Sequence, residues 1–520
     1  MPTFLSPEQA PISLTFLTFI ALFLGVGIYS GLHQTETTED YLLASRNVNP
    51  WFTALSAIAT GNSGFMFIGL IGFTYQVGVS TLWLSIGWLI GDWIAWFTVH
   101  QRLREISEVV GSETISAFLG HTLPHHLPEA LRELSGEPSR EVPGNPSREV
   151  SGEISEGAIA SATIPPLSGE SHSRWITIVS ALITLFFLGA YAAAQLQAGS
   201  KALTVIFGWD YSVGVFLGAI VVAIYCLTGG IRASIWIGSV QAVIMIGSML
   251  LLLGVALTTA GGVPELLSQL RTIDAALLSP IPVNLQFGFL PFLLSWIVAG
   301  FGVVGQPHIM VRAMAIDSAE NIQVARNVYL VLQTLFSVAA IAVGLASRVL
   351  LPDLMALGGD VELALPELAT YLLPGLLVGL VLAGLFSATL STADAQVLSC
   401  SAALTQDIFP KAARSLVWVR VGTLCTILVV LAIALLGSDS VFTLVTFAWA
   451  ALAAGLGPLM VIRTLQRPVR PAIGVTMILT GVAVALLWRF GFHWSGSLYE
   501  VLPGMVASSL VYGLGNISGK

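Results

Sequence analysis

Residues 54–70, ALSAIATGNSGFMFIGL, form an apolar stretch that small and polar residues interrupt near its middle. Consecutive Gly and small polar residues lower helix propensity, and backbone groups freed at bilayer depth need protein partners or a water-lined cavity. Two interpretations follow: a membrane helix broken at a binding site, or a close packing face built of small residues. The interrupting residues are Thr60, Gly61, Asn62, Ser63 and Gly64.

A second apolar segment is interrupted in a similar way at residues 299–309, AGFGVVGQPHI. Pro307 lacks a backbone donor and clashes with the preceding helical turn, and Gly300, Gly302 and Gly305 come before it. Two Gly- or Pro-interrupted spans in corresponding places of two halves are the best sequence pointer to the midplane site of a secondary transporter. The pair therefore favours a broken helix at residues 54–70.

The composition is that of a polytopic membrane protein. The chain has 520 residues, of which 55% are hydrophobic and 10% charged, and its mean hydropathy is +0.85. Apolar runs near membrane-spanning length recur from end to end, which excludes a soluble globule. A net charge of -8 without a basic patch argues against nucleic acid as a partner. The cysteines show no metal-ligand spacing and are interpreted as packing residues.

Apolar windows separated by polar breaks predict about thirteen transmembrane helices in an all-α fold. The predicted spans are residues 12–32, 51–73, 79–99, 175–197, 211–229, 233–257, 288–309, 327–349, 371–403, 416–437, 440–462, 471–488 and 499–515. Most Lys and Arg residues fall in the loops of one side, which predicts an external N-terminus and a cytoplasmic C-terminus in the plasma (inner) membrane.

The two interrupted spans are the second and the seventh, and they cross the membrane in opposite directions. This is the pattern of an inverted five-plus-five repeat with discontinuous helices. We expect a single transmembrane domain over residues 1–520, with core repeats at about 51–257 and 288–462. Residues 258–287 are expected to form an external loop with a short amphipathic helix.

Residues 121–173 differ from the rest of the chain in composition. They are rich in Pro, Glu, Ser and Gly and contain PSREV twice, at 138–142 and 146–150. Such a segment cannot bury enough apolar surface to order itself, so we expect a disordered cytoplasmic insertion. A tolerated low-complexity segment and a partner-binding segment both fit this composition.

The ninth span carries hydroxyl groups on one helix face. Within GLFSATLSTADAQVLSCSAALTQD, residues 384–407, Ala388, Ser391 and Thr392 stand at i, i+3 and i+4. A sodium ion prefers oxygen ligands, and backbone carbonyls of Ala59 and Asn62 near the break are suited to complete the set. The alternative is that both hydroxyls bond back to the preceding helical turn.

Several motifs together resemble the sodium:solute symporter family, and within it the sodium/proline symporters. The resemblance covers nearly the whole chain apart from 121–173. The matching segments are DYLLASRNVNPWFTALSA at 40–57, NSGF at 62–65, TGGIRAS at 228–234, GQPHIMVRAMAIDS at 305–318, STADAQVLSCSAALTQDIF at 391–409 and FAWAALAAGLGP at 447–458.

The resemblance implies the five-plus-five fold and alternating access driven by co-transported Na⁺. It places sodium at Ala59, Asn62, Ala388, Ser391 and Thr392, as reasoned above. For the substrate it implies Ser63, Gly64, Phe65, Tyr191, Gln306 and Pro307. The chain departs from the family pattern at Gly61 and Gly238, where acidic residues are expected, and at Ala299 and Val303, where aromatic residues are expected.

Three charged residues are candidates for coupling or gating. Asp394 lies near the face of Ser391, and it either strengthens cation or proton binding or pairs with a basic loop residue near the cytoplasmic end. Arg46 precedes the second span as a cytoplasmic gate or as a snorkelling anchor. Asp92 is an intramembrane carboxylate without an assigned counterpart.

We therefore expect a sodium-coupled symporter that imports a small organic solute, an amino acid such as proline, across the lipid bilayer. Alternatives are a sodium- or proton-coupled carrier for a sugar, vitamin or carboxylate, and a membrane sensor that acts through a separate partner. An enzyme is not expected, because no Ser/His/Asp set or paired metal ligands converge. The sequence does not predict the oligomeric state.

Overall fold

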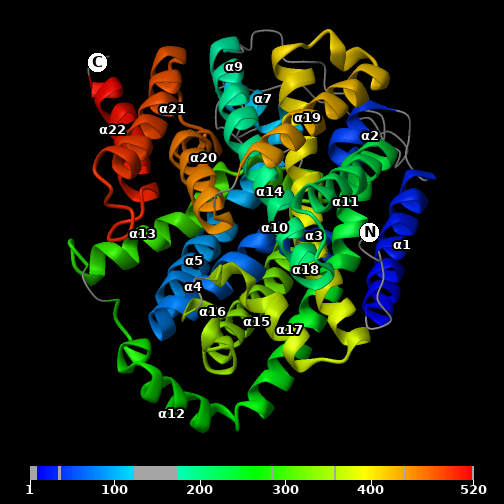
Figure 1. Ribbon diagram of the computed structural model, residues 1–520. Coiled ribbons are helices and arrows are strands. Elements are labelled where there is room, and N and C mark those ends of the chain that lie inside the picture. The colour runs from blue at the N-terminus through cyan, green and yellow to red at the C-terminus, as the bar shows by residue number, and fades with distance from the viewer. Residues whose placement is uncertain are drawn as a thin grey trace, which may run out of the picture.

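The computed structural model is a bundle of α-helices (Figure 1). It describes residues 9–32, 37–121, 173–282, 285–356, 359–437 and 440–517. Within these ranges the backbone forms no β-strand, apart from one isolated parallel bridge between Val48 and Ile316. The predicted insertion, 121–173, lies outside the described residues except for its two end positions.

The helices are α1 (Ala10–Leu32), α2 (Thr38–Leu43), α3 (Pro50–Gly64), α4 (Ile71–Val77), α5 (Leu82–Ala95), α6 (Gln101–Val109), α7 (Ile115–Gly120), α9 (Arg174–Ile183), α10 (Gly189–Phe207), α11 (Tyr211–Thr259), α12 (Val263–Ile273), α13 (Phe289–Phe301), α14 (Pro307–Ala315), α15 (Ile322–Leu350), α16 (Asp353–Ala356), α17 (Ala364–Leu372), α18 (Gly375–Ala402), α19 (Leu416–Leu436), α20 (Val441–Thr464), α21 (Pro471–Leu486) and α22 (Val501–Ile517). Short π-helical segments join α3 to α4, α5 to α6 and α9 to α10.

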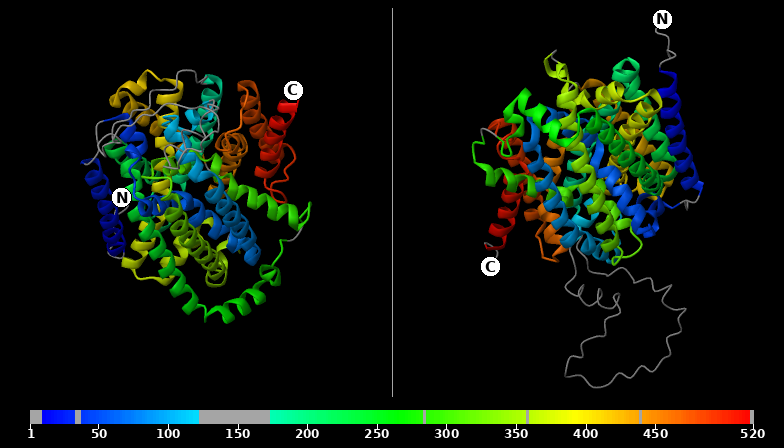
Figure 2. Two further views of the ribbon diagram at one scale, coloured as in Figure 1. Left: turned by 180° about the vertical axis from the view of Figure 1, so that it is seen from behind. Right: turned by 90° about the horizontal axis from the view of Figure 1, so that it is seen from below.

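The first and last helices lie at opposite edges of the bundle. All views place α1 at one edge and α22 at the other (Figures 1 and 2). Helix α12 lies at one end of the bundle, while α2, α7 and α9 lie at the other end (Figure 1). Helices α18 and α20 are the most buried crossings, and α18 packs against α1, α3, α10 and α11. A helix with so many helical neighbours is the centre of the fold.

Both interrupted spans are broken, as predicted. In the second span the helical dihedrals lapse at Ser63 alone (φ 50°, ψ −176°), and the chain continues through Phe65–Leu70 into α4. In the seventh span α13 passes through a 3₁₀ turn, Gly302–Gly305, and an extended Gln306 before α14 begins. The two halves of that span are bent by 58°. The break in the second span is therefore narrower than its sequence suggested.

Helix α11 contains the predicted fifth and sixth spans. Its 49 residues include a single non-helical position, Gly230 (φ 53°, ψ −142°). A Cβ atom there would lie 2.3 Å from the carbonyl oxygen of Tyr41, so only Gly fits. A straight helix of this length would measure about 73 Å, more than twice the hydrocarbon core of a bilayer. The chain therefore has enough length for two crossings that meet at Gly230.

The exact number of crossings stays a prediction. Among the described residues, nine helical runs are long and apolar enough to span a membrane, and the bent α13–α14 pair makes ten. Pro50–Val109 counts as one run although it contains the predicted second and third spans, and α22 falls among the shorter apolar helices.

Several span ends differ from the sequence prediction. The seventh span continues to Ala315, beyond residue 309, because Pro307 begins a new helix instead of ending one. The ninth begins at Gly375, since the residues before it form the separate helix α17. The amphipathic helix predicted within residues 258–287 is confirmed as α12, Val263–Ile273.

Helices α5 and α13 touch through their backbones. A Cβ atom on Gly91 would lie 1.8 Å from the carbonyl oxygen of Ile297, and one on Gly300 would lie 2.0 Å from that of Trp88. Small residues allow such close approach between membrane helices, where packing rather than the hydrophobic effect holds them together. This contact fixes the third span against the first half of the broken seventh span.

We expect Gly91→Ala to lower the thermal stability of the detergent-purified protein, because the added methyl group must push two backbones apart. Overpacking of this kind costs about 1–3 kcal/mol. The matched control is Gly254→Ala in α11, where a Cβ atom would meet nothing within 4 Å. An unfolding temperature of Gly91→Ala equal to that of the control would contradict the contact.

Candidate transport site

Oxygen atoms of α18 and α3 meet at the centre of the bundle. The Ser391 hydroxyl donates to the carbonyl oxygens of Ala59 (2.9 Å) and Ala388 (3.2 Å). The Thr392 hydroxyl donates to the carbonyl oxygens of Thr60 and Ala388, both at 2.9 Å. Both hydroxyls thus bond back to their own helix and also reach across to α3, so each of the two interpretations of this motif describes part of the arrangement.

This cluster has the chemistry of a sodium site. Two hydroxyl and three carbonyl oxygens gather without a formal charge, and Ser391 and Thr392 are fully buried. Hard monovalent cations accept such neutral oxygen ligands in place of water. Asn62 is engaged elsewhere: its side-chain oxygen accepts from Gln333 (2.8 Å), and its carbonyl oxygen accepts from the N–H group of Phe65.

Tyr191 of α10 lies between the two helix breaks. Its hydroxyl donates to the Ser63 hydroxyl (3.3 Å), and its ring meets the His308 ring edge-on, with 5.7 Å between centroids. At the same break the N–H group of Gly64 donates to the side-chain oxygen of Gln195 (2.7 Å). The Gln195 side chain of α10 therefore satisfies a backbone N–H group at the break, while Tyr191 bonds the Ser63 side chain.

The break of the seventh span is held by α20. The Gln306 side-chain nitrogen donates to the carbonyl oxygen of Trp449 (3.1 Å). The indole N–H of Trp449 in turn donates to the carbonyl oxygen of Ala299 (2.9 Å). The side-chain oxygen of Gln306 is buried and has no hydrogen-bond partner. Pro307 is the first residue of α14. A free acceptor and a helix N-terminus thus face the same discontinuity.

Two adjoining cavities lead from the α12 end toward the breaks. The outer one has a volume of about 530 Å³, and its lining includes Asp274, Phe442 and Arg489. The inner one has a volume of about 30 Å³, and its lining includes Gly61, Phe65, Trp88, Gln333 and Ser337. Both are lined by Leu84 and Trp296, so they lie side by side. At the boundary of the two cavities the Phe65 ring stacks on the rings of Trp88 and Phe442, with 6.1 Å and 5.3 Å between centroids.

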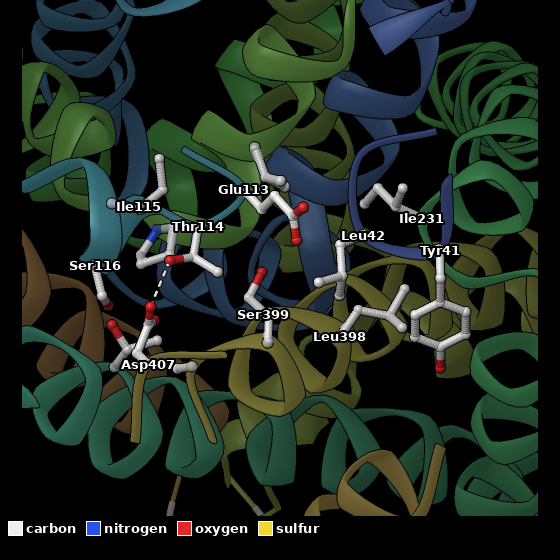
Figure 3. A pocket seen from close by; sticks show the side chains of 15 residues that line it. Tyr41, Leu42, Glu113, Thr114, Ile115, Ser116, Ile231, Leu398, Ser399 and Asp407 are labelled. Atoms are coloured by element: carbon white, nitrogen blue, oxygen red, sulfur yellow. Dashed lines mark hydrogen bonds between the residues drawn. The ribbon is translucent and has the colours of Figure 1, made fainter. Parts of the chain in front are cut away.

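A third cavity lies at the opposite end and is acidic (Figure 3). It has a volume of about 30 Å³, and its lining reaches from Pro307 to Asp407 and Glu113. The Thr114 hydroxyl donates to Asp407 at 2.8 Å. Burial and the neighbouring Glu39 raise the pKa of Glu113. Carboxylates at this position would attract a cation that leaves the site toward this end.

Arg46 ties the ends of three segments together at the end opposite α12. Its guanidinium donates to the Ser107 hydroxyl (3.0 Å) and to the carbonyl oxygens of Met314 (3.1 Å) and Ser112 (2.7 Å). Burial and the nearby Arg104 lower the pKa of Arg46 to about 10, so it stays charged at neutral pH. These bonds favour a gate over a snorkelling anchor.

Asp394 is linked to a basic residue through a hydroxyl. The Ser234 hydroxyl donates to Asp394 (2.9 Å) and accepts from Arg312 (3.2 Å). Arg312 also donates to the Ser56 hydroxyl (3.2 Å). Both charged residues are buried, so the basic partner lies on α14 within the bundle and not in a loop. Asp92, the third candidate, accepts a hydrogen bond from the Tyr329 hydroxyl (2.7 Å).

Five residues of this region were not singled out from the sequence. Each is a polar side chain, or a Trp with a polar ring atom, inside an apolar span, which is the signal that would have found it. They are Gln195, Ser234, Tyr329, Gln333 and Trp449.

Two broken crossings, a buried oxygen cluster between the first of them and α18, and cavities from both ends define a secondary transporter. A family model described as the sodium:solute symporter family matches residues 41–123 and 169–466. The chain belongs to the sodium:solute symporter family.

Relatives with assigned functions are also transporters. The chain is 29% identical to the sodium/proline symporter of Escherichia coli and 30% identical to that of Salmonella typhimurium, over 98% of this chain and 94% of each relative. It is 27% identical to a high-affinity proline transporter of Bacillus subtilis, over 93% of both chains.

Solved structures agree on the fold. A Na⁺-coupled sialic acid symporter in a substrate-bound outward-open state matches with a TM-score of 0.73 at 16% identity, over 97% of both chains. The nucleobase-cation-symport transporter Mhp1 in a closed conformation matches with a TM-score of 0.52 at 16% identity, over 91% of this chain and 92% of that one.

Family membership confirms the predicted resemblance, the helical multi-pass fold, the coupling to Na⁺ and the assignment as a transporter and not an enzyme.

We expect Asp394→Asn and Arg312→Gln each to lower the unfolding temperature, because each leaves one buried charge without its counterpart. Breaking a buried pair costs about 3–5 kcal/mol. The double variant removes both charges and should recover part of the loss. A thermal double-mutant cycle measures this, and strictly additive losses would show that the two residues are not coupled.

Proposed function

We propose that this protein imports proline together with Na⁺ by alternating access in the plasma membrane, with the N-terminus outside and the C-terminus in the cytoplasm. The observation that carries the proposal is the oxygen cluster of Ser391 and Thr392 against α3, next to the break at Ser63. The sodium/proline symporters among the relatives support the choice of solute.

The candidate substrate site suits a small zwitterion. The N-terminus of α14 favours a carboxylate, because the positive end of the helix dipole lies there. The free side-chain oxygen of Gln306 is an acceptor for the ammonium group. The rings of Tyr191 and Phe65 offer apolar faces to the body of the solute. No full side-chain charge is required by this arrangement.

The position of the sodium cluster explains how coupling would work. Sodium bound there would take oxygens from α3 and α18 at once, and so would stabilise the state in which these helices touch. The solute would bind at the break of the same α3. Two ligands that favour the same state bind cooperatively. Inward movement of one positive charge releases about 2.3 kcal/mol per 100 mV of membrane potential, which drives accumulation of a neutral solute.

The domain arrangement belongs to the same proposal. The core repeats, about 51–257 and 288–462, would place the breaks at Ser63 and Gln306 in corresponding positions, while 121–173 is a bystander to transport. In the alternative, a sensor acting through a separate partner would need that insertion. Deleting 121–173 distinguishes the two, because transport persists only if the insertion is not required.

Solute identity is tested by counterflow into proteoliposomes with labelled amino acids, sugars and vitamins, each with and without sodium. We expect exchange of labelled proline only when sodium is present. Sodium-dependent exchange of a different solute would show that the protein is a symporter for that solute and not for proline. Absence of any sodium-dependent exchange would refute both sodium-coupled symport and proline as its solute.

We expect Ser391→Ala combined with Thr392→Ala to abolish sodium-dependent uptake while membrane insertion is kept, because both hydroxyl ligands are lost. The matched control is Thr334→Ala, which removes a hydroxyl that bonds only to the carbonyl oxygen of Leu330 on its own exposed helix face. Uptake by the double variant that still rises normally with sodium would show that the ion binds elsewhere.

A further inference from the structure

A buried carboxylate beside the break of the second span lacks a counter-charge. Asp92 of α5 is 1% exposed, and its carboxylate accepts a hydrogen bond from the Tyr329 hydroxyl. Its second carboxylate oxygen has no hydrogen-bond partner among the residues that the structure describes. None of the ion pairs within the described ranges includes Asp92. An ionised carboxylate in this state is costly in a bilayer, and a cation that reaches it removes the cost.

The neighbouring elements contain few groups that could neutralise Asp92. Neither α13 nor the Gly302–Gly305 turn carries a titratable side chain. The His100 ring stacks on the Trp96 ring, with 4.2 Å between centroids. Its Nδ1 atom is hydrogen-bonded to the carbonyl oxygen of Ala95. Arg326 of α15 lies over the exposed ring of Phe97. The group in direct contact with the carboxylate is the neutral phenol of Tyr329.

The inner cavity ends one helical turn from this carboxylate. Trp88 of α5 lines the cavity and precedes Asp92 by four residues, while Gln333 of α15 lines it and follows Tyr329 by four residues. Gly61 connects the two places, since it lines the cavity and a Cβ atom on it would lie 3.5 Å from the Tyr329 hydroxyl. Gly61 therefore places the lining of the cavity next to the Tyr329 hydroxyl.

Oxygen ligands for a cation are present along this face of α15. The buried side-chain oxygen of Gln333 has no hydrogen-bond partner, and its side-chain nitrogen donates to Asn62 beside the break (2.8 Å). Together with the Tyr329 hydroxyl and the free oxygen of Asp92, these are the donor types that hold hard cations.

We propose that Asp92, with Tyr329, binds a second monovalent cation, Na⁺ or H⁺, that enters from the inner cavity. This site lies between α5 and α15, whereas the Ser391–Thr392 cluster lies between α3 and α18. The inference rests on the proposed symport, which it deepens by adding one coupled positive charge per transport cycle. Cation binding at Asp92 acts on the second span through Gln333 and Asn62.

The test compares wild type, Asp92→Asn and Tyr329→Phe as full-length proteins in proteoliposomes. Asparagine keeps the size of the side chain and an acceptor for Tyr329 but loses the charge. We measure uptake against sodium concentration at two pH values on either side of neutrality, together with the reversal potential under sodium and proton gradients. If the cation is Na⁺, the sodium concentration for half-maximal uptake rises about tenfold in Asp92→Asn. If it is H⁺, the pH dependence disappears instead.

In both cases the charge moved per solute falls by one in Asp92→Asn, and Tyr329→Phe weakens cation dependence while keeping that charge. As a readout independent of transport, the rise in unfolding temperature on adding sodium or lowering pH should shrink in Asp92→Asn. Unchanged sodium affinity, pH dependence and charge per solute in Asp92→Asn would overturn this inference alone. Wild-type protein without sodium-dependent uptake of any solute would overturn the proposed function, and this inference with it.

Discussion

Backbone groups that leave a helix inside a bilayer must be hydrogen-bonded by the protein itself, and the structure depends on meeting this demand at two places. At Ser63 the N–H of Gly64 is bonded by Gln195 of α10, and the carbonyl of Ala59 accepts from Ser391 of α18. At the seventh span the carbonyl oxygen of Ala299 accepts from the indole N–H of Trp449 on α20. Each break is therefore hydrogen-bonded to its neighbouring helices. A ligand that enters a break would compete for these same hydrogen bonds.

In the proposed function the same residues would serve both the fold and the binding of sodium. Ser391 and Thr392 satisfy α3 carbonyls with hydroxyl hydrogens, and a sodium ion would satisfy the same carbonyls by coordination. Both arrangements meet the demand of the backbone, so exchanging one for the other need not cost much free energy. The end opposite α12 is closed separately, through Arg46 and the pairing of Val48 with Ile316. Binding at the centre can thus be linked to opening at an end without loss of the core.

Sequence reasoning located the breaks because Gly, Pro and small polar residues have local effects. It identified the i, i+3, i+4 face of α18 for the same reason. It did not find that Thr60 accepts from Thr392, or that the partner of Asp394 is Arg312, reached through Ser234. Those pairings depend on how α3, α11 and α14 are rotated about their axes, which is a property of packing. Gly230 was only partly predictable. The apolar pattern placed a boundary between spans 211–229 and 233–257, but only the contact with Tyr41 explains why the residue there must be Gly.

Asp394 and Asp92, two of the buried carboxylates, differ in one respect that bears on coupling. Asp394 has a positive charge within the same hydrogen-bond network, so that network is close to neutral without a ligand. Asp92 has only a phenol, so its surroundings are neutral only when a cation or a proton is bound. Electrostatics in a low-dielectric interior therefore separates them: the first holds α14, α11 and α18 together, and the second is, in our proposal, the place that a positive charge would occupy. A transporter that moves cations needs both properties, and the chain keeps them on different helices, α18 and α5.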